Sequence, residues 1–297
     1  MIAALLATGV WSLSTLASSR GAAHLGGISA NLVRLAGALP LLVLAALGLG
    51  LTPWTVAMAP GGAWFVVSGL VGMGICDILT LNAYRRCGAR LTVLLVNTIA
   101  VPTAAVIGWT ALGEHPSPGQ ALGMLAIIGG LLLVLWPRDA VPRDGVGIAY
   151  AVLAAILFGS STVMSRLGFA AAAVQGTPIH WLDSTILRVA AGVLLCALAF
   201  LLATPFARHW RDGPGRWRFA LPWLLLNACL GPGLGLACYQ WALVTTPAAQ
   251  VHAVIAVIPL LVLIVTWLQG EERPSLVAVL GTLLAVLGVV ALSLLTG

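Results

Sequence analysis

Residues 102–114 read PTAAVIGWTALGE, and residues 259–271 read PLLVLIVTWLQGE. Each stretch begins with a proline inside an apolar run and ends with Gly-Glu. The shift that superposes the two stretches also superposes residues upstream of them, so the chain is predicted to contain two copies of one unit. The superposed positions are Gly74 with Gly231, Tyr84 with Trp241, Pro102 with Pro259, Gly113 with Gly270 and Glu114 with Glu271.

Composition places both copies in a lipid bilayer. Of the 297 residues, 61% are hydrophobic and 7% are charged, with a mean hydropathy of +1.08. Soluble domains have about 45–50% apolar and about 25% charged residues. A soluble protein of this length could not bury so much apolar surface, and we therefore expect an integral membrane protein with an all-α fold.

Apolar runs between polar breaks predict ten transmembrane helices, since a span needs roughly 20 apolar residues. Residues 1–136 then form a first five-helix repeat, residues 146–297 form a second, and residues 137–145 connect them. An odd number of spans in each repeat gives the two copies opposite orientations. Such inverted repeats are characteristic of secondary transporters. The expected spans are 1–19, 28–51, 63–84, 91–111, 118–136, 146–165, 180–205, 219–241, 249–268 and 275–295.

Each half resembles one unit of the drug/metabolite transporter superfamily, in its ten-helix EamA type. The resemblance covers nearly the whole chain and is carried by the passage from the fourth to the fifth helix. That passage reads Pro102…Gly113-Glu114…Gly123 in one half and Pro259…Gly270-Glu271…Gly281 in the other. An aromatic residue followed by a small one also occurs in each first helix, as Trp11-Ser12 and Phe158-Gly159, where Trp-Gly is usual. The resemblance implies a multi-pass protein of the cell membrane with cytoplasmic termini.

The distribution of arginine predicts the opposite orientation. All 14 basic residues are arginines, and the connections on one membrane face hold eleven of them, whereas the other face holds Arg166 alone. The positive-inside rule makes the arginine-rich face cytoplasmic and puts both termini outside. We assign these arginines to orientation and to lipid headgroups, because no basic stripe with interleaved aromatic residues indicates nucleic-acid binding.

Helix breaks indicate where a solute binds. Pro102 and Pro259 fall near the middle of expected spans, and Pro232 lies within a Gly-Pro-Gly sequence. A proline inside a helix leaves a carbonyl group without its hydrogen bond, and matched breaks in two repeats point to a central site. The alternative is that the prolines only kink helices for packing. The candidate substrate-binding residues are Trp11, Asn97, Pro102, Phe158, Asn227, Pro232, Tyr239 and Pro259.

Charged residues inside the apolar runs are candidates for coupling or for a buried ion pair. Arg34 and Asp77 are predicted at comparable depth in neighbouring spans, where they form either a titratable vestibule or a static pair. In the second half, Arg188 lies one turn after Asp183, which neutralises it or caps the helix. His252 is either a proton relay or a satisfied residue at the membrane interface.

Glu114 and Glu271 follow Gly113 and Gly270 at predicted helix ends. They are interpreted as fold-defining junctions, with proton coupling as the alternative. The run Ser117-Pro118-Gly119-Gln120 resembles a capping box with proline at the first helical position, which supports a junction there.

These features favour a secondary transporter, an exporter or permease of a small organic solute or metabolite, working by alternating access. One alternative is a membrane-embedded lipid-modifying enzyme, which the absence of metal and nucleophile motifs disfavours. Another is a passive channel or scaffold. We expect no cofactor and no metal, because the five cysteines form no C-x-x-C pair. The expected partners are the solute and membrane lipids, with possible proton coupling, in a monomer or homodimer.

Overall fold

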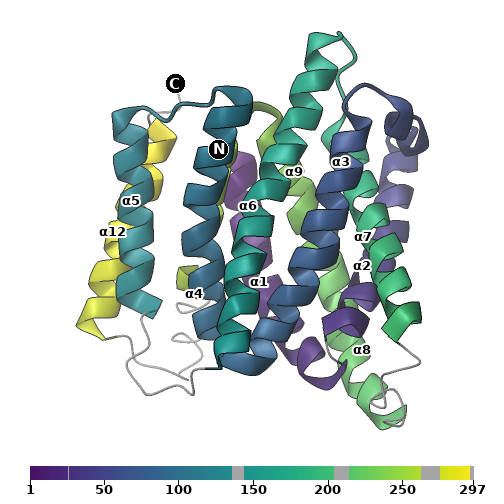
Figure 1. The fold of residues 1–297 in the computed structure, drawn as a ribbon, viewed down its shortest axis with the longest axis horizontal. Helices are drawn as coiled ribbons and strands as arrows, with labels where there is room; N and C mark the ends of the chain where they lie inside the picture. The colour runs from purple at the N-terminus through teal and green to yellow at the C-terminus, as the bar shows by residue number, and fades with distance from the viewer. Residues whose placement is uncertain (26, 136–143, 204–213, 262–274, 295–297) are drawn as a thin grey trace.

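A computed structural model describes residues 1–25, 27–135, 144–203, 214–261 and 275–294, and every regular element in these ranges is helical (Figure 1). Six helices within them are long and apolar enough to cross a membrane: Gly27–Gly48, Gly62–Gly88, Leu91–Leu112, Gly145–Val174, Trp181–Leu202 and Trp217–Thr245. The expectation of an all-α membrane protein is confirmed at this level.

The first half contains α1 (Ile2–Leu25), α2 (Gly27–Gly48), the short 3-10 helix η1 (Pro53–Met58), α3 (Gly62–Ser68), the π-helix η2 (Gly69–Cys76), α4 (Asp77–Leu112) and α5 (Pro118–Leu135). The second half contains α6 (Gly145–Val174), α7 (Trp181–Ala203), α8 (Pro214–Ala228), the π-helix η4 (Cys229–Gly235), α9 (Leu236–Thr245), α10 (Ala248–Ile255) and α12 (Leu276–Leu294).

Two expected spans meet at a sharp turn inside α4. Gly88 has φ 76° and ψ 161°, a conformation open to glycine and closed to residues with a Cβ, and it separates the span that ends there from Leu91–Leu112. The chain therefore reverses direction within a few residues, as the short predicted connection requires. The sixth helix is longer than expected: the sequence predicts a span over residues 146–165, whereas α6 continues to Val174.

The prolines break the helices in different ways. Pro232 lies within the π-helix η4, where the hydrogen-bond pattern is already altered. Near Pro259 the expected span 249–268 is interrupted in its described part, as the proline predicts: α10 ends at Ile255, and a turn at residues 256–257 precedes the proline. Pro259 cannot donate to the carbonyl four residues earlier, which is that of Ile255. Pro102, by contrast, lies inside α4 without such a turn.

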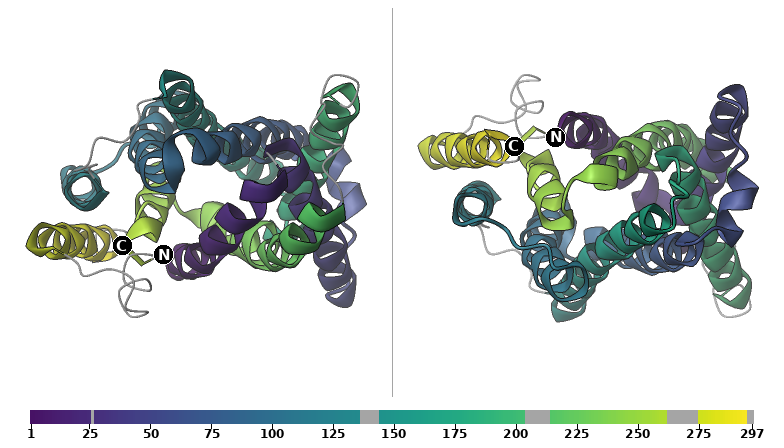
Figure 2. Two further views of the ribbon diagram at one scale, coloured as in Figure 1. Left: turned by 90° about the horizontal axis from the view of Figure 1, so that it is seen from below. Right: turned by 90° about the horizontal axis from the view of Figure 1, so that it is seen from above.

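The helices form one main bundle with a pair of helices at its end. α5 and α12 pack against each other beside the bundle, at the left of Figure 1 and in both views of Figure 2. Glycines allow this close approach: a Cβ on Gly288 would lie 2.6 Å from the backbone oxygen of Gly123, and one on Gly281 would lie 2.8 Å from that of Gly130. The small-residue contact is typical of helices that associate in lipid.

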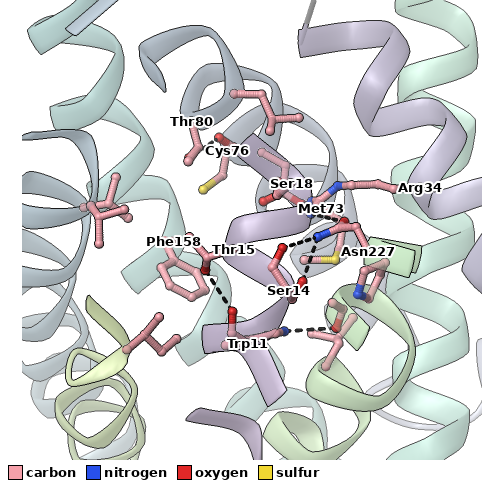
Figure 3. Close-up of a pocket in the computed structure, with 18 of the residues that line it drawn as sticks. Trp11, Ser14, Thr15, Ser18, Arg34, Met73, Cys76, Thr80, Phe158 and Asn227 are labelled. Atoms are coloured by element: carbon pink, nitrogen blue, oxygen red, sulfur yellow. Dashed lines mark hydrogen bonds and ion pairs between the residues drawn. The ribbon is translucent and has the colours of Figure 1, made fainter. Parts of the chain in front are cut away.

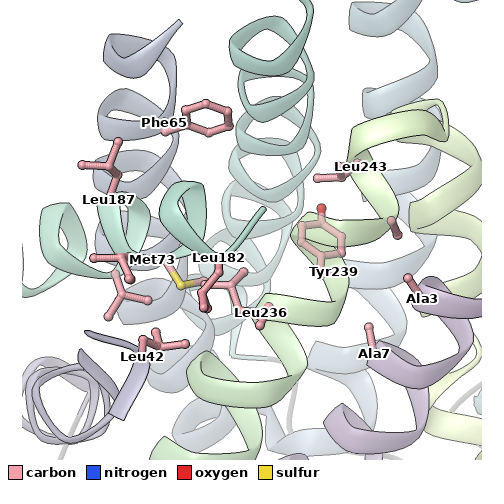
Figure 4. Packing of buried hydrophobic residues seen from close by; sticks show 14 of the residues in the cluster. Ala3, Ala7, Leu42, Phe65, Met73, Leu182, Leu187, Leu236, Tyr239 and Leu243 are labelled. Carbon is pink, nitrogen blue, oxygen red and sulfur yellow. The ribbon is translucent and has the colours of Figure 1, made fainter. Parts of the chain in front are cut away.

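A buried apolar core joins the helices around the centre of the main bundle (Figure 4). Phe65, Met73 and Leu187 lie on one side of it, and Tyr239 lies near Ala7 of α1 on the other. The outward faces carry large apolar side chains, for example Leu276 at 75% exposure and Leu294 at 77%. This inverted pattern suits a surface that faces lipid tails.

Candidate functional site

A cavity of about 150 Å³ lies between the two halves of the chain (Figure 3). It contains aromatic rings, amides, hydroxyl groups and one ion pair. Both halves of the chain contribute lining residues. The first half contributes them from α1, α2, η2 and α4. The second half contributes them from α6, α8, η4, α9 and the residues around the end of α10. The polar and aromatic lining residues are Trp11, Ser14, Thr15, Ser18, Arg34, Asp77, Thr80, Tyr84, Asn97, Phe158 and Asn227.

Trp11 joins α1 to the π-helix of the second half. Its indole Nε1 donates a hydrogen bond to the backbone oxygen of Gly231 at 3.0 Å. The same oxygen also accepts the backbone N–H of Leu236 within η4, so the two lone pairs of this carbonyl are shared between the π-helix and the indole. The ring of Trp11 lies 6.4 Å from that of Phe158 and 5.1 Å from that of Tyr239, between centroids. The three rings form an aromatic layer at one end of the cavity.

Asn227 of α8 lines the cavity and bonds to side chains of α1 and α2. Its amide Nδ2 donates to the backbone oxygen of Ser14 at 2.9 Å and to the Oγ of Ser14 at 2.7 Å. Its Oδ1 accepts a hydrogen bond from Nη1 of Arg34 at 3.4 Å. One amide side chain of α8 therefore connects α1 and α2 at the cavity surface.

Arg34 and Asp77 form an ion pair, as their predicted depth allowed. The Nε of Arg34 also donates to Oδ1 of Asn31 at 2.7 Å, which fixes the guanidinium plane. The two side chains are 12% and 20% exposed, so water in the cavity reaches the pair. The pair thus joins α2 to the start of α4 and offers both a cation and an anion to a bound molecule.

The cavity extends toward the helix ends that carry arginine. Ser18 lies in the last turns of α1 near Arg20, and Tyr84 directly precedes Arg85. At this end the guanidinium of Arg20 lies 4.6 Å from the ring centroid of Trp223 in α8. The cavity therefore opens toward the face that the sequence identifies as arginine-rich.

Beyond the aromatic layer the bundle is closed. Thr162 of α6 is hydrogen-bonded to both Tyr239 and His252, and all three residues are at most 1% exposed. Arg188 lies next to them with its Cζ 5.8 Å from the ring centroid of Tyr239. Its Nη1 donates to Oε1 of Gln240 at 2.7 Å, and the Nε2 of Gln240 donates to Ser184 at 3.0 Å.

The closed end has a second contact between the halves. Arg166 of α6 pairs with Glu114 at 2.8 Å and donates from Nη1 to the backbone oxygens of Leu243 and Val244, both at 2.9 Å. The other oxygen of Glu114 accepts from the backbone N–H of Ala248 at 3.0 Å, which caps the N-terminus of α10. Glu114 directly follows Gly113, which ends α4 with φ 66°. Its contacts with Arg166 and Ala248 therefore join the end of α4 to the second half of the chain.

Most of the candidate substrate residues reach the cavity, and some do not. Trp11, Asn97, Phe158, Asn227 and Pro232 line it, together with Arg34 and Asp77. Tyr239 belongs to the aromatic layer but lies behind Trp11 and does not line the cavity, and neither do Pro102 and Pro259. Gly270 and Glu271 lie outside the described residues.

Three details of the sequence interpretation need correction or completion. Asp183 does not neutralise Arg188, because its Oδ1 has no hydrogen-bond partner and Arg188 bonds to Gln240 instead. His252 is a buried, hydrogen-bonded residue, because its Nε2 contacts Thr162 and its side chain is almost fully covered. The lining residues Ser14 and Ser18 were missed, although they follow Trp11 at helical spacing on one face of α1.

The predicted capping box is confirmed. The backbone N–H of Ser117 donates to Oε1 of Gln120 at 2.9 Å, and the N–H of Gln120 donates to Oγ of Ser117 at 3.3 Å. The start of α5 is therefore fixed by its own side chains.

Comparison with known proteins agrees with this architecture. The sequence profile of the EamA-like transporter family matches residues 1–136 and again residues 145–294. The uncharacterized transporter YoaV of Bacillus subtilis is 25% identical over 231 residues, 76% of this chain and 74% of that protein. The uncharacterized protein PA1977 of Pseudomonas aeruginosa is 31% identical over 197 residues, 63% of this chain and 61% of that protein. A solved crystal structure has a TM-score of 0.77 and 17% identity over 99% of this chain and 96% of its own, a likeness of fold.

Proposed function

Because the chain belongs to the EamA-like transporter family and is a multi-pass membrane transporter of small solutes, we propose that it is a secondary transporter working by alternating access. In a bacterium this places it in the plasma membrane. A small organic solute would cross through the central cavity, which opens alternately to the two faces. Membership of a transporter family favours this activity over that of a lipid-modifying enzyme.

The proposed topology is ten spans in two inverted five-helix repeats, residues 1–136 and 146–297. Four shorter apolar helices accompany the six long ones and support this number: Ile2–Thr15, Pro118–Val134, Ala248–Leu261 and Leu276–Leu292. The π-helices η2 and η4 support the repeat, because they occupy corresponding places in the two halves. So does the pairing of α5 with α12, the last helix of each repeat.

The observation that carries the proposal is that the cavity lies between the halves and ends inside the protein. Trp11 and Asp77 come from the first repeat and Phe158 and Asn227 from the second, so relative motion of the repeats would reshape the cavity. Toward the other face, the buried network around Thr162 and the Glu114–Arg166 pair close the path. A channel would need a continuous path, which this arrangement interrupts.

The lining chemistry supports a small solute that is partly aromatic or apolar. The volume resembles that of cavities of about 150 Å³ that hold a benzene-sized molecule. Trp11 and Phe158 offer ring faces, whereas Asn97 and the Arg34–Asp77 pair offer hydrogen bonds and charge. The side chain of Asp77 also supports proton coupling, because water in the cavity reaches it.

The arginine-rich face is proposed to be cytoplasmic, following the positive-inside rule. The state described here would then open to the cytoplasm. A reporter enzyme that works only in the cytoplasm, fused after Gly297, should be inactive in this orientation, and an active fusion would reverse the assignment.

The function is tested by solute counterflow in proteoliposomes against a panel of amino acids, aromatic acids and amines, with and without a pH gradient. A secondary transporter gives counterflow that saturates with solute. Flux that rises linearly with concentration would indicate a channel, and its absence for the whole panel together with turnover of a lipid substrate would indicate an enzyme.

A further inference from the structure

Arg188 of α7 is a cation without a counter-ion in the described part of the chain. Its side chain is 0% exposed and is the largest of the fully buried side chains that the structure describes. Nη1 donates to Gln240, but Nε and Nη2 have no hydrogen-bond partner. An unpaired charge in the interior of a membrane protein is strongly unfavourable. Arg188 would therefore be stabilised by a partner gained in a second conformation.

The acidic residues that the structure describes leave one suitable partner. Glu114 pairs with Arg166, and Asp144 pairs with the exposed Arg86. Asp183 lies five residues before Arg188 in α7, so the two side chains point about 140° apart and make no ion pair. Asp77, in contrast, pairs with Arg34 at the cavity and directly follows η2, the segment against which Arg188 lies.

The π-helix η2 connects Asp77 to Arg188. A Cβ on Gly72 would lie 3.0 Å from Nη2 of Arg188, so the free edge of the guanidinium lies against η2. A Cβ on Gly69 would likewise meet the backbone of Arg188, at 2.6 Å from its Cα. η2 ends at Cys76, directly before Asp77. The carboxylate is thus attached to the segment on which Arg188 rests.

A register change in η2 would move Asp77 between the two arginines. A π-helix has i→i+5 hydrogen bonds, and such segments occur frequently at functional sites. Return of one residue to the α-helical pattern rotates the following residues by about 100° around the axis, since an α-helix has 3.6 residues per turn. The glycines of η2 pack directly against α7, so this rotation requires the two segments to shift relative to each other.

The two arginines occupy related places. Arg34 lies in α2 and Arg188 in α7, the second helix of each proposed repeat. Arg34 faces the open cavity and would be hydrated if Asp77 left it, whereas Arg188 is dry and gains most from a carboxylate.

We propose that Asp77 exchanges its partner during transport, pairing with Arg34 when the cavity opens to the arginine-rich face and with Arg188 when it opens to the other. One carboxylate then neutralises the two guanidinium groups in turn. Arg188 is accordingly a positioning residue of the transport cycle. The inference rests on the alternating access proposed above.

Hydrogen exchange of the purified protein without solute tests this, with mass spectrometry of the peptide that covers residues 243–250 at the closed end. Arg34→Gln releases Asp77 to Arg188, and exchange in this peptide should become at least about tenfold faster. Arg188→Gln removes the second partner, and exchange should be slower than in the wild type. In an Asp77→Asn background, Arg34→Gln should have no further effect.

Two variants control for folding and for loss of any arginine. Arg188→Lys keeps the charge and should restore near wild-type exchange, whereas Arg85→Gln, at an exposed helix end, should leave it unchanged. The proposal is overturned if Arg34→Gln and Arg188→Gln shift exchange in the same direction, or if the effect of Arg34→Gln persists with Asp77→Asn. If instead this peptide stays protected in every variant and proteoliposomes show no counterflow, alternating access itself is contradicted.

Discussion

Oε1 of Glu114 lies 2.8 Å from the guanidinium Nη2 of Arg166, and this ion pair joins the end of α4 to α6 at the closed end of the bundle. The same carboxylate accepts the backbone N–H of Ala248 at 3.0 Å. Three segments therefore meet at one largely buried side chain. These residues do not line the central cavity, but their contact holds the closed end together, so its strength sets how readily that end opens.

Replacing Glu114 should loosen that end. In Glu114→Gln the ion pair is lost while the side chain keeps its size, and Arg166 is left without a counter-charge. We expect the free energy of unfolding to fall by about 1 to 3 kcal/mol, the range for removing a hydrogen-bonded partner from a partly buried charge. Unfolding of the purified protein in detergent measures this. Arg86→Gln, at an exposed pair, is the control, and an equal loss in both variants would contradict the assignment.

Trp11 should matter to transport through its hydrogen bond to Gly231. Trp11→Phe keeps a ring in the aromatic layer and removes the bond to η4. A hydrogen bond and part of an aromatic contact contribute about 1 to 2 kcal/mol, so the half-saturation concentration of counterflow should rise roughly tenfold. Trp109→Phe, on an outward face at 57% exposure, should leave it unchanged. The same kinetics in both variants would remove Trp11 from the site.

Neighbouring glycines of α5 should differ sharply in their tolerance of alanine. A Cβ on Gly130 would lie 2.8 Å from the Cβ of Ala285 in α12, whereas a Cβ on Gly129 has its nearest neighbour at 3.7 Å. Gly130→Ala should lower the free energy of unfolding by about 1 to 3 kcal/mol through overpacking. Gly129→Ala should be neutral or slightly stabilising because alanine favours helix. Equal melting temperatures would show that α5 and α12 pack differently.

The ion pair between Asp144 and Arg86 should make a small contribution to the free energy of unfolding that depends on pH. The hydrogen bond from Arg86 lowers the pKa of Asp144, which also caps α6 through the N–H of Val146 at 3.0 Å. A carboxyl group whose pKa is lowered by folding stabilises the protein above its unfolded pKa of about 3.9, and this contribution disappears as the pH falls through the folded pKa. Asp144→Asn keeps the cap, so its melting temperature should lie below that of the wild type at pH 7 and approach it near pH 3. A constant difference would assign the effect to the cap alone.

Much of this architecture follows from the sequence, because lipid imposes simple demands on it. Apolar runs of span length had to be helices, and a charge inside such a run favours a partner, as Arg34 has in Asp77. The ion pair was predictable from depth alone, since both residues lie at similar distances from helix ends that are close in the chain.

Features that depend on packing were not predictable. The π-register of η2 arises where glycines meet α7, and no periodicity signals it. Tyr239 is behind the cavity wall because Trp11 lies in front of it, a matter of how α1 sits between distant helices. The missing partner of Arg188 is likewise visible only when all surrounding side chains are placed.

The central claim is that solute crosses through the cavity between the halves. Thr80 lines this cavity, and its replacement by tryptophan would fill much of the space near the Arg34–Asp77 pair. The decisive measurement is saturable counterflow in proteoliposomes of the wild type and of Thr80→Trp, each reconstituted in equal amount and with its folding verified by melting temperature. We predict saturable counterflow for the wild type and loss of it in the folded variant. Undiminished counterflow in Thr80→Trp would contradict the account, because the solute would then cross by another route.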